Sequence, residues 1–277
     1  MTYASVLTTA VRRLRHFSDS PALDAELLLA HALNSDRPTI ICHPQSEIGR
    51  PAAFKFQRLV ERRRRHIPIA YLIGQQEFYG LPLIINRNVL VPRPCTEMLV
   101  SAIIDHYSDG QGLTILDLGT GSGAIALALA QYLPRAKIIA IDKSAGALRV
   151  AKLNSRRLKL SGRIIFRRCS LASLPKRRIT GDIIVANLPY LKPSQLAAPS
   201  IRHEPRLALA GGPDGWLYIK QLIDVAKNMP VLAALVLECD PGQVQSLRRM
   251  LRASWPSARI INLHDGRVTR GFAVWIN

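Results

Sequence analysis

Long apolar runs and acidic residues are both scarce in this sequence of 277 residues. No apolar run reaches the roughly 18 residues that a helix needs to span a bilayer, so we expect no membrane segment. The N-terminal stretch spreads its arginines through an amphipathic pattern and lacks the compact apolar segment and small-residue cleavage site of a signal peptide. The sequence therefore predicts a cytoplasmic protein.

Closely spaced cysteines are absent as well. The chain has four, and no pair has the spacing of a metal knuckle or of a redox Cys-x-x-Cys motif; they are Cys42, Cys95, Cys169 and Cys239. We therefore expect free thiols in a reducing compartment and no metal site.

The shortage of acidic residues leaves the chain strongly basic. There are 19 aspartates and glutamates against 38 lysines and arginines, which gives a formal net charge of +19. A field of that sign attracts polyanions, so proximity to the ribosome or to other RNA is one interpretation. A host whose proteins are all basic is the other, and the diffuse spread of the charge leaves both open.

The N-terminal part of the chain has the apolar spacing of helices. Residues 1–70 predict a small helical bundle, and Ser20 followed by Pro21 is typical of a helix start. The predicted helices span residues 3–17, 21–33, 38–42 and 51–65. Residues 71–94 predict a linking β-hairpin, with two apolar strands on either side of the polar turn Asn86–Asn88. The predicted hairpin strands are 78–85 and 89–91.

The rest of the chain, residues 95–277, alternates short apolar runs with helical patterns. Such alternation predicts a doubly wound, mostly parallel sheet with helices on both faces. The last two apolar runs are close together and predict an antiparallel closing pair. The predicted strands are 113–117, 136–142, 163–168, 181–186, 231–239, 258–263 and 270–276.

A glycine-rich run follows the first of these strands. Asp117 ends the strand, and Gly119, Gly121 and Gly123 allow the backbone to turn tightly and to approach a ligand closely. A helix begins near Ala124 and offers its free N–H groups to an anion. The pattern fits both a nicotinamide dinucleotide and S-adenosylmethionine, and taken alone it does not separate them.

Asp142 ends the next strand, where a carboxylate can accept hydrogen bonds from both hydroxyls of a nucleotide ribose. The same side chain can also cap the following helix, and the two roles are compatible. Either nucleotide would use such a residue, so Asp142 supports a nucleotide site without naming its ligand.

The run Asn187–Tyr190 lies at the end of a later strand. It favours S-adenosylmethionine over a nicotinamide dinucleotide, because a hydride-transfer site has no need for it. The side-chain oxygen of Asn187 and the carbonyl oxygen of Leu188 can each accept one N–H of a planar NH2 group. Both acceptors bind more strongly as that nitrogen gains positive charge in a methyl transfer. Pro189 stiffens the loop, and Tyr190 can stack on the planar group.

With these residues the chain resembles a known family, the release factor glutamine N5-methyltransferases. That family methylates the glutamine in the Gly-Gly-Gln loop of class I peptide chain release factors. The resemblance covers nearly the whole sequence. Its segments are Asp24–Leu29, Pro68–Gly74, Glu77–Leu83, Leu90–Pro94, Asp117–Ala128, Asn187–Tyr190 and Glu204–Gly215.

The resemblance implies a seven-stranded, doubly wound, Rossmann-like class I methyltransferase sheet over residues 95–277. A substrate-docking helical domain at 1–70 and a hairpin linker at 71–94 would precede it. The implied cofactor is S-adenosyl-L-methionine, and the implied partners are class I release factors. The implied substrate-binding and catalytic residues are Asn187, Leu188, Pro189 and Tyr190. The implied cofactor-binding residues are Asp117, Gly119, Thr120, Gly121, Ser122, Gly123, Asp142, Leu171 and Asn187.

Three positions depart from the family pattern. Leu188 stands where the family usually has the first proline of Asn-Pro-Pro-Tyr, but its carbonyl acceptor survives, so we expect activity to persist. Cys95 stands where an aspartate is usual. Ser170 lies where the family has an acidic residue, and a hydroxyl accepts a hydrogen bond from the adenine amine more weakly than a carboxylate does.

Other functions remain open at the level of sequence. Glutamine methylation of a ribosomal protein and N6 methylation of adenine present the same planar NH2 group, although a base must first be flipped out. A catalytically weakened, basic RNA- or ribosome-binding module is an alternative of another class. A nicotinamide dehydrogenase has the least support, because no histidine or tyrosine motif for proton relay accompanies the glycine run.

Overall fold

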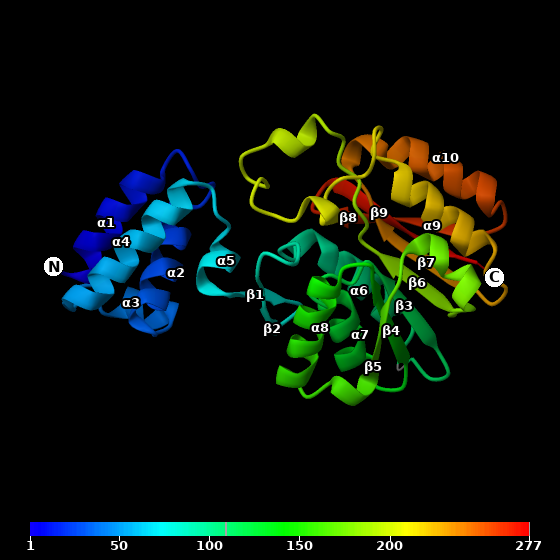
Figure 1. Cartoon of the computed structure of the whole chain (residues 1–277), viewed down its shortest axis with the longest axis horizontal. Helices are drawn as coiled ribbons and strands as arrows, with labels where there is room; N and C mark the ends of the chain where they lie inside the picture. The colour runs from blue at the N-terminus through cyan, green and yellow to red at the C-terminus, as the bar shows by residue number, and fades with distance from the viewer. Residues whose placement is uncertain (109, 277) are drawn as a thin grey trace. The chain divides into compact units, whose positions relative to one another are not determined.

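The computed structural model describes residues 1–108 and 110–276, and the chain forms two compact units (Figure 1). The first contains Met1–Gln75 and the short segment Ala197–His203. The second contains Gln76–Leu196 and the chain from Glu204 onward. Among the described residues, no helix is both long enough and apolar enough to cross a bilayer.

The first unit is helical, as expected. Its core is fully buried at Leu14, Leu28 and Ile40. The first helix ends before the predicted residue Phe17, and the fifth was not predicted because so short a segment shows no clear helical period. The helices are α1 (Tyr3–Leu14), α2 (Pro21–Leu33), α3 (Arg37–Cys42), α4 (Arg50–Arg64) and α5 (Ile69–Ile73).

A segment distant in sequence belongs to this helical unit. Arg202 donates a hydrogen bond from its guanidinium to the carbonyl oxygen of Arg65 at 2.6 Å, and a ring nitrogen of His203 lies 2.8 Å from the same oxygen. These contacts satisfy a carbonyl at the C-terminal end of α4, where the helix itself offers no partner. The chain therefore returns to its first unit between β6 (Ile183–Ala186) and β7 (Ala234–Glu238) of the second unit.

A two-stranded hairpin follows α5, as predicted, but the prediction misplaces its strands and its turn. The strands are β1 (Gln75–Phe78) and β2 (Leu81–Ile84), and residues 89–91 are not a strand. The expected strand 78–85 contains only β2 in full, and the polar turn Asn86–Asn88 forms after the hairpin. Tyr79 and Gly80 make the turn, with φ of 51° and 74°. A two-residue hairpin turn of this kind needs two left-handed residues. The expected turn residue Asn86 instead accepts a hydrogen bond from the backbone N–H of Asn88 at 2.9 Å.

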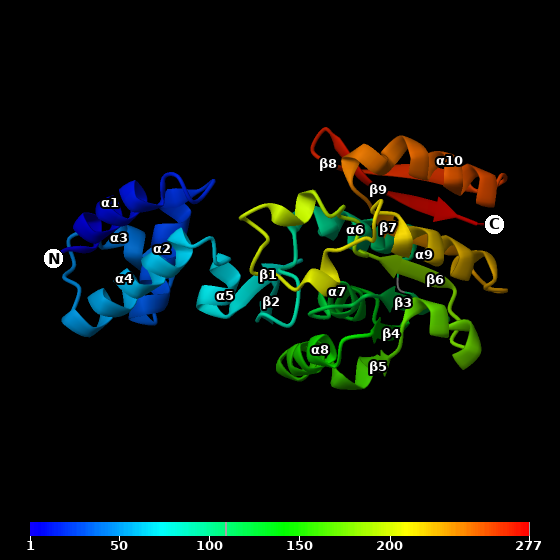
Figure 2. The same ribbon diagram turned by 45° about the horizontal axis from the view of Figure 1, so that its top comes forward.

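The second unit is built on the expected seven-stranded sheet, whose strand order is β5-β4-β3-β6-β7-β9-β8. The pairs among β3 to β7 are parallel, while β9 runs antiparallel to both β7 and β8, so the predicted closing pair is confirmed. Figure 2 shows β8 and β9 at one edge of the sheet and β5 at the other. The strands are β3 (Thr114–Leu118), β4 (Lys137–Asp142), β5 (Ile164–Arg168), β6 (Ile183–Ala186), β7 (Ala234–Glu238), β8 (Arg259–Asp265) and β9 (Val268–Trp275).

The strand order determines where the candidate ligand site lies. The chain leaves β3 for its neighbour β4 and returns to pair β6 on the other side of β3, so the direction of winding reverses there. In open parallel sheets a crevice forms beyond the carboxyl ends of the strands at such a point. The carboxyl ends of β3, β4 and β6 carry the candidate residues, and the crevice brings them to one edge.

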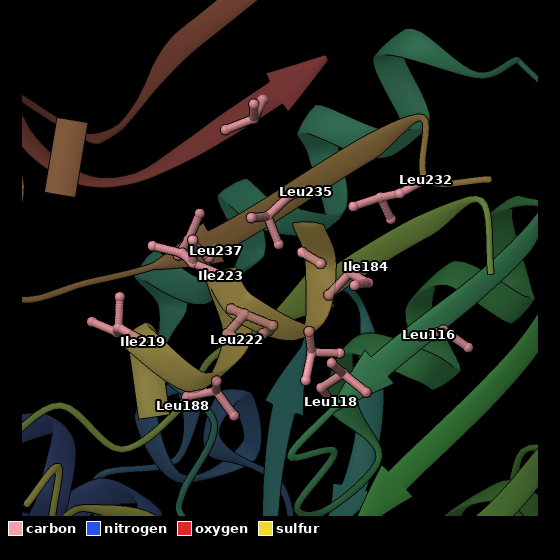
Figure 3. Packing of buried hydrophobic residues seen from close by; sticks show 14 of the residues in the cluster. Leu116, Leu118, Ile184, Leu188, Ile219, Leu222, Ile223, Leu232, Leu235 and Leu237 are labelled. Atoms are coloured by element: carbon pink, nitrogen blue, oxygen red, sulfur yellow. The ribbon is translucent and has the colours of Figure 1, made fainter. Parts of the chain in front are cut away.

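Helices cover both faces of the sheet because side chains along a strand alternate between the faces. Leu116 and Leu118 of β3 pack in one cluster with Ile219 and Leu222 of α9, as Figure 3 shows. Asp117, between them, points to the opposite face and bonds the backbone of α7. The helices of this unit are α6 (Glu97–His106), α7 (Ala124–Tyr132), α8 (Ala145–Arg157), α9 (Leu217–Lys227) and α10 (Val244–Ser254).

Candidate active site

The glycine run makes a tight loop between β3 and α7. Its three glycines, Gly119, Gly121 and Gly123, have φ of 77°, 57° and 85°, in the left-handed region that glycine adopts at little cost. A side chain at Gly119 would also meet Leu188, since an added Cβ would lie 3.1 Å from Leu188 Cδ2. The loop therefore needs glycine for its turns and, at Gly119, for its close approach to the Asn187–Tyr190 segment.

Asp117 lies behind this loop. It is fully buried, and its Oδ2 accepts hydrogen bonds from the Thr120 hydroxyl at 2.5 Å and from the backbone N–H of Ala126 at 3.1 Å. Its Oδ1 has no hydrogen-bond partner among the described residues. Burial raises the pKa of Asp117 to about 7. The contacts join the turn of the loop to the first turn of α7, which gives Asp117 a bracing role.

A cavity of about 390 Å³ opens beside the loop. The structure brings seven of the predicted residues to its wall: Gly119, Gly121, Asp142, Leu171, Asn187, Leu188 and Pro189. The remaining predicted residues are not among those that line it: Asp117, Thr120, Ser122, Gly123 and Tyr190.

Asp142 faces the cavity from the end of β4 and also clamps the loop. One carboxylate oxygen accepts a hydrogen bond from the backbone N–H of Gly121 at 3.0 Å, and the other accepts one from Ser144 at 2.7 Å. Burial raises the pKa of Asp142, while these two hydrogen bonds oppose the rise. A carboxylate oxygen can accept more than one hydrogen bond, so the group keeps acceptor capacity for hydroxyls in the cavity.

The cavity is also lined by two residues that the sequence analysis missed, Lys143 and Tyr218. The ammonium group of Lys143 donates to the hydroxyl of Tyr218 at 2.7 Å and lies 4.6 Å from the centre of its ring. Both side chains line the cavity, near Leu171. Lys143 could have been suspected because it directly follows Asp142, whereas no local pattern marks Tyr218. Ser170 lines the same region, and its hydroxyl donates to Ser173 Oγ at 3.2 Å.

Asn187 enters the cavity directly after β6, with its amide nitrogen turned into the protein. That nitrogen donates hydrogen bonds to Thr96 Oγ1 at 2.9 Å and to Glu238 Oε2 at 3.0 Å. Neither Asn187 Oδ1 nor the carbonyl oxygen of Leu188 has a hydrogen-bond partner within residues 1–108 and 110–276. Two adjacent acceptors are thus left for a group that enters the cavity.

Leu188, which stands where the family usually has a proline, packs into the apolar core. It is buried and packs in the cluster that includes Ile219 and Leu222 of α9 (Figure 3). The side chain forms an apolar wall between the glycine loop and α9. The backbone of the same residue supplies the free carbonyl oxygen, which is independent of the side chain.

Tyr190 stands behind Asn187 and is fixed from two directions. Its hydroxyl donates to Glu238 Oε1 at 3.1 Å, and its backbone lies so close to Gly211 that a Cβ added there would be 2.6 Å from Tyr190 Cα. Burial, followed by the charge of Glu238, raises the pKa of Tyr190. The phenol is therefore neutral and serves as a hydrogen-bond donor.

Glu238 and Thr96 are two further functional candidates that the sequence analysis missed. Glu238 is the last residue of β7 and is 2 % exposed, and it accepts a hydrogen bond from the Thr96 hydroxyl at 2.7 Å. Burial raises its pKa, against the hydrogen bonds from Thr96, Tyr190 and Asn187. A charged residue that ends an apolar strand is the signal that singled out Asp142, and the same signal was present here.

Comparison with known proteins identifies the family. Residues 5–74 match the PrmC N-terminal domain family, and residues 109–262 match a methyltransferase domain family. The release factor glutamine methyltransferase of Moorella thermoacetica is 39 % identical over 91 % of this chain and 90 % of its own length. Those of Coxiella burnetii and Rhodopirellula baltica are 37 % and 40 % identical, over 87 % and 81 % of this chain and 87 % and 78 % of theirs.

The chain belongs to the release factor glutamine methyltransferase family. Two solved structures support the fold of this family member. The hMettl16 catalytic domain is 17 % identical with a TM-score of 0.60, over 77 % of this chain and 81 % of that one. A human methyltransferase 10 domain containing protein is 21 % identical with a TM-score of 0.52, over 72 % and 90 %. The fold is that of the class I methyltransferases.

Membership of this family makes S-adenosyl-L-methionine the cofactor and sets aside the nicotinamide interpretation of the glycine loop. The residues present fit that molecule. Gly119 and Gly121 form a side-chain-free cradle in the cavity wall, and Asp142 offers a carboxylate to hydroxyls. Leu171 and Tyr218 provide apolar surface for a flat base.

Proposed function

We propose that this protein transfers a methyl group to the side-chain amide nitrogen of the glutamine in the Gly-Gly-Gln loop of class I peptide chain release factors. The observation that carries the proposal is a pair of acceptors, Asn187 Oδ1 and the Leu188 carbonyl oxygen, at the wall of the cavity; neither has a hydrogen-bond partner in the described part of the chain. The relatives named for release factor glutamine methylation support the choice of substrate.

The two acceptors match the chemistry of an amide. A carboxamide nitrogen is a weak nucleophile because its lone pair is delocalised into the carbonyl group. Its two N–H groups lie in one plane, and Asn187 and Leu188 can each accept one of them. As the nitrogen bonds to carbon its N–H groups become more acidic, so both hydrogen bonds strengthen in the transition state. These residues both orient the nitrogen and lower the barrier.

S-adenosyl-L-methionine would supply an electrophilic methyl carbon attached to a sulfonium, and its sulfur would leave as a neutral thioether that keeps the electrons of the broken C–S bond. Gly119, Gly121 and Asp142 would hold it, and the amide gripped by Asn187 would face that carbon in line. Pro189 restricts the backbone of Leu188 to extended geometry, which fixes where its carbonyl oxygen points. Once methylated, the nitrogen has one proton more than the neutral product and releases it to solvent; no strong base is needed at this site.

The remaining interpretations stay predictions. The helical domain at 1–70 is proposed to dock the release factor, with residues 71–94 as linker and 95–277 as the transferase. Proximity to the ribosome or RNA rests on the net charge of +19 alone, and the cytoplasmic location rests on sequence composition. Both are compatible with a substrate that works in translation termination.

Intact-mass analysis tests the function. A Gly-Gly-Gln release factor incubated with enzyme and S-adenosyl-L-methionine should gain one methyl group, and peptide mapping should place it on the glutamine. Asn187→Ala should abolish transfer while calorimetric affinity for the donor stays close to that of the wild type. Absence of any gain in mass, with a donor-bound enzyme, would rule out this substrate.

A partition experiment covers the other acceptors. With radiolabelled donor, the label should appear in the release factor and not in ribosomal protein or in RNA and DNA fractions. Label in the nucleic acid would identify adenine methylation, and label in ribosomal protein would redirect the search to another glutamine. No label in any fraction, together with absent donor binding, would indicate a catalytically inactive basic protein.

A further inference from the structure

The geometry points to Glu238 as a positioning residue that, together with Thr96, turns the amide of Asn187 so that its oxygen faces the cavity. The catalytic consequence of this inference rests on the proposed function, whereas the orientation itself does not. Glu238 acts only through Asn187 and contacts neither the substrate nor the cofactor.

Four hydrogen-bond donors reach the Glu238 carboxylate: the Cys95 thiol, whose Sγ lies 4.0 Å from Oε1, and three closer oxygen and nitrogen donors. Oε2 accepts from Thr96 Oγ1 at 2.7 Å and from Asn187 Nδ2 at 3.0 Å, and Oε1 accepts from the Tyr190 hydroxyl at 3.1 Å. The three closer donors come from two parts of the second unit: Thr96 lies in the turn before α6, and Asn187 and Tyr190 lie in the loop after β6. The register of the sheet pairs Ala186 with Leu237, so the next residue on each strand, Asn187 and Glu238, are neighbours.

Both oxygens of Glu238 accept in these hydrogen bonds, and a carboxylate that carries no proton can only accept, which decides the orientation of the amide. If the Asn187 amide were flipped, its oxygen would face Glu238 Oε2 with no proton between them. Thr96 cannot relieve that clash, because its single proton is already donated to Glu238. Its oxygen is left as an acceptor, and Asn187 Nδ2 donates to it at 2.9 Å. The three groups form a closed triangle with one consistent direction of donation.

The triangle explains why the Asn187 oxygen is available for substrate. The amide nitrogen of Asn187 donates both of its hydrogen bonds to groups inside the protein, whereas the amide oxygen has no partner among the described residues. A freely rotating asparagine would present its NH2 group part of the time, and that group would repel the N–H of a substrate amide. Glu238 prevents this by making the flipped state electrostatically unfavourable.

A swap of donor and acceptor tests the inference. N187D places a second carboxylate against Glu238, and kcat should fall by about 100-fold or more. E238Q should lower kcat by about 10- to 100-fold with little change in KM for the release factor, because the grip matters most in the transition state. In the double variant the new carboxamide at 238 can donate to the new carboxylate at 187, which leaves a carboxylate oxygen facing the cavity. The double variant should therefore recover at least about tenfold over N187D.

A charge-matched control accompanies these variants. D224N removes a carboxylate from the exposed face of α9 and should leave kcat, KM and donor affinity unchanged. Donor affinity measured by calorimetry should stay within about twofold in every variant that retains its fold. Wild-type kinetics for E238Q, or no recovery in the double variant, would overturn the inference, because a merely structural glutamate gives no reason for E238Q to restore kcat to N187D.

A second measurement tests the orientation of the Asn187 amide even if the variants fail to fold or the release factor is not the substrate. In wild-type protein labelled with 15N-asparagine, the side-chain NH2 protons of Asn187 should exchange with solvent at least about tenfold more slowly than those of exposed Asn34. Exchange as fast as at Asn34 would show that the amide is not held and would overturn the inference directly. A held amide in an enzyme that fails to methylate release factor would instead contradict only the proposed function.

Discussion

Asn154 and Ile84 exchange two hydrogen bonds, from Ile84 N–H to Asn154 Oδ1 at 2.7 Å and from Asn154 Nδ2 to the Ile84 carbonyl oxygen at 3.0 Å. The same nitrogen donates to the carbonyl oxygen of Ser122 in the glycine loop at 3.0 Å. The completely buried Asn154 side chain of α8 thus pairs with the backbone N–H and C=O of β2, as a neighbouring strand would, and also bonds the glycine loop. Hairpin and loop are coupled through one amide.

This coupling predicts a large loss of stability in N154L. Leucine has a similar size but leaves the backbone groups of Ile84 and Ser122 without partners, so the free energy of unfolding should fall by about 2–5 kcal/mol. Urea titration followed by circular dichroism measures it. L153A, at an exposed position of the same helix, is the control and should change stability by less than about 1 kcal/mol. Equal effects of the two changes would contradict the proposed bracing.

Gly119→Ala should damage both the loop and the donor site. Alanine is strained at a φ of 77°, and its Cβ would press on Leu188. We expect a loss of about 1–3 kcal/mol in stability and, since Gly119 lines the cavity, at least a tenfold rise in the dissociation constant of the donor. Gly112→Ala provides the matched control, because its φ of 74° imposes the same strain while no atom of the described residues lies within 4 Å of the added Cβ. It should lower stability and leave donor affinity unchanged.

The pH dependence of stability should include a contribution from Asp117. Its pKa rises from an ordinary 3.8 to about 7 in the folded protein, so the folded state binds more protons than the unfolded state between these values. The free energy of unfolding therefore falls as the pH rises through this window, by about 3 kcal/mol between about pH 5 and about pH 8. D117N lacks this titration. The difference in stability between wild type and D117N should change by that amount across the window, and a constant difference would refute the assignment.

Tyr218 is expected to form one wall of the base pocket. Tyr218→Ala removes a flat surface from the cavity and should weaken donor binding by about tenfold, in line with the loss of one aromatic stacking contact. Tyr218→Phe keeps the ring and loses only the hydroxyl that accepts from Lys143, so its affinity should stay within about threefold of the wild type. Calorimetry with S-adenosyl-L-methionine distinguishes the two. Similar affinities for Tyr218→Ala and the wild type would remove Tyr218 from the pocket.

Several parts of the fold could be predicted because local patterns decide them. Each buried parallel strand is a short apolar run, so the seven strands were found, and strand ends singled out Asp142 and Asn187. The hairpin turn was misplaced because the polar run Asn86–Asn88 has stronger turn propensity than Tyr79–Gly80. The turn at Tyr79 is instead stabilised from a distance, since its backbone N–H donates to Glu97 Oε1 at 2.8 Å.

The candidate site could be predicted only in part. The glycine motif indicates a loop but not which of its side chains faces the cavity, and Thr120 turned out to bond Asp117 behind it. Thr96, Asn187 and Glu238 are far apart in the sequence, and only the order of the strands brings them together. Their hydrogen bonds depend on tertiary structure that no local pattern encodes.

The return of Ala197–His203 to the helical unit has a practical consequence for dissecting this enzyme. The chain passes between the two units at three places, so neither unit is a single continuous stretch of sequence. A fragment that begins at Gln76 would retain Arg202 and His203 but lose the Arg65 carbonyl they hold. Isolating the transferase will require replacing that excursion with a short linker as well as trimming the N-terminus.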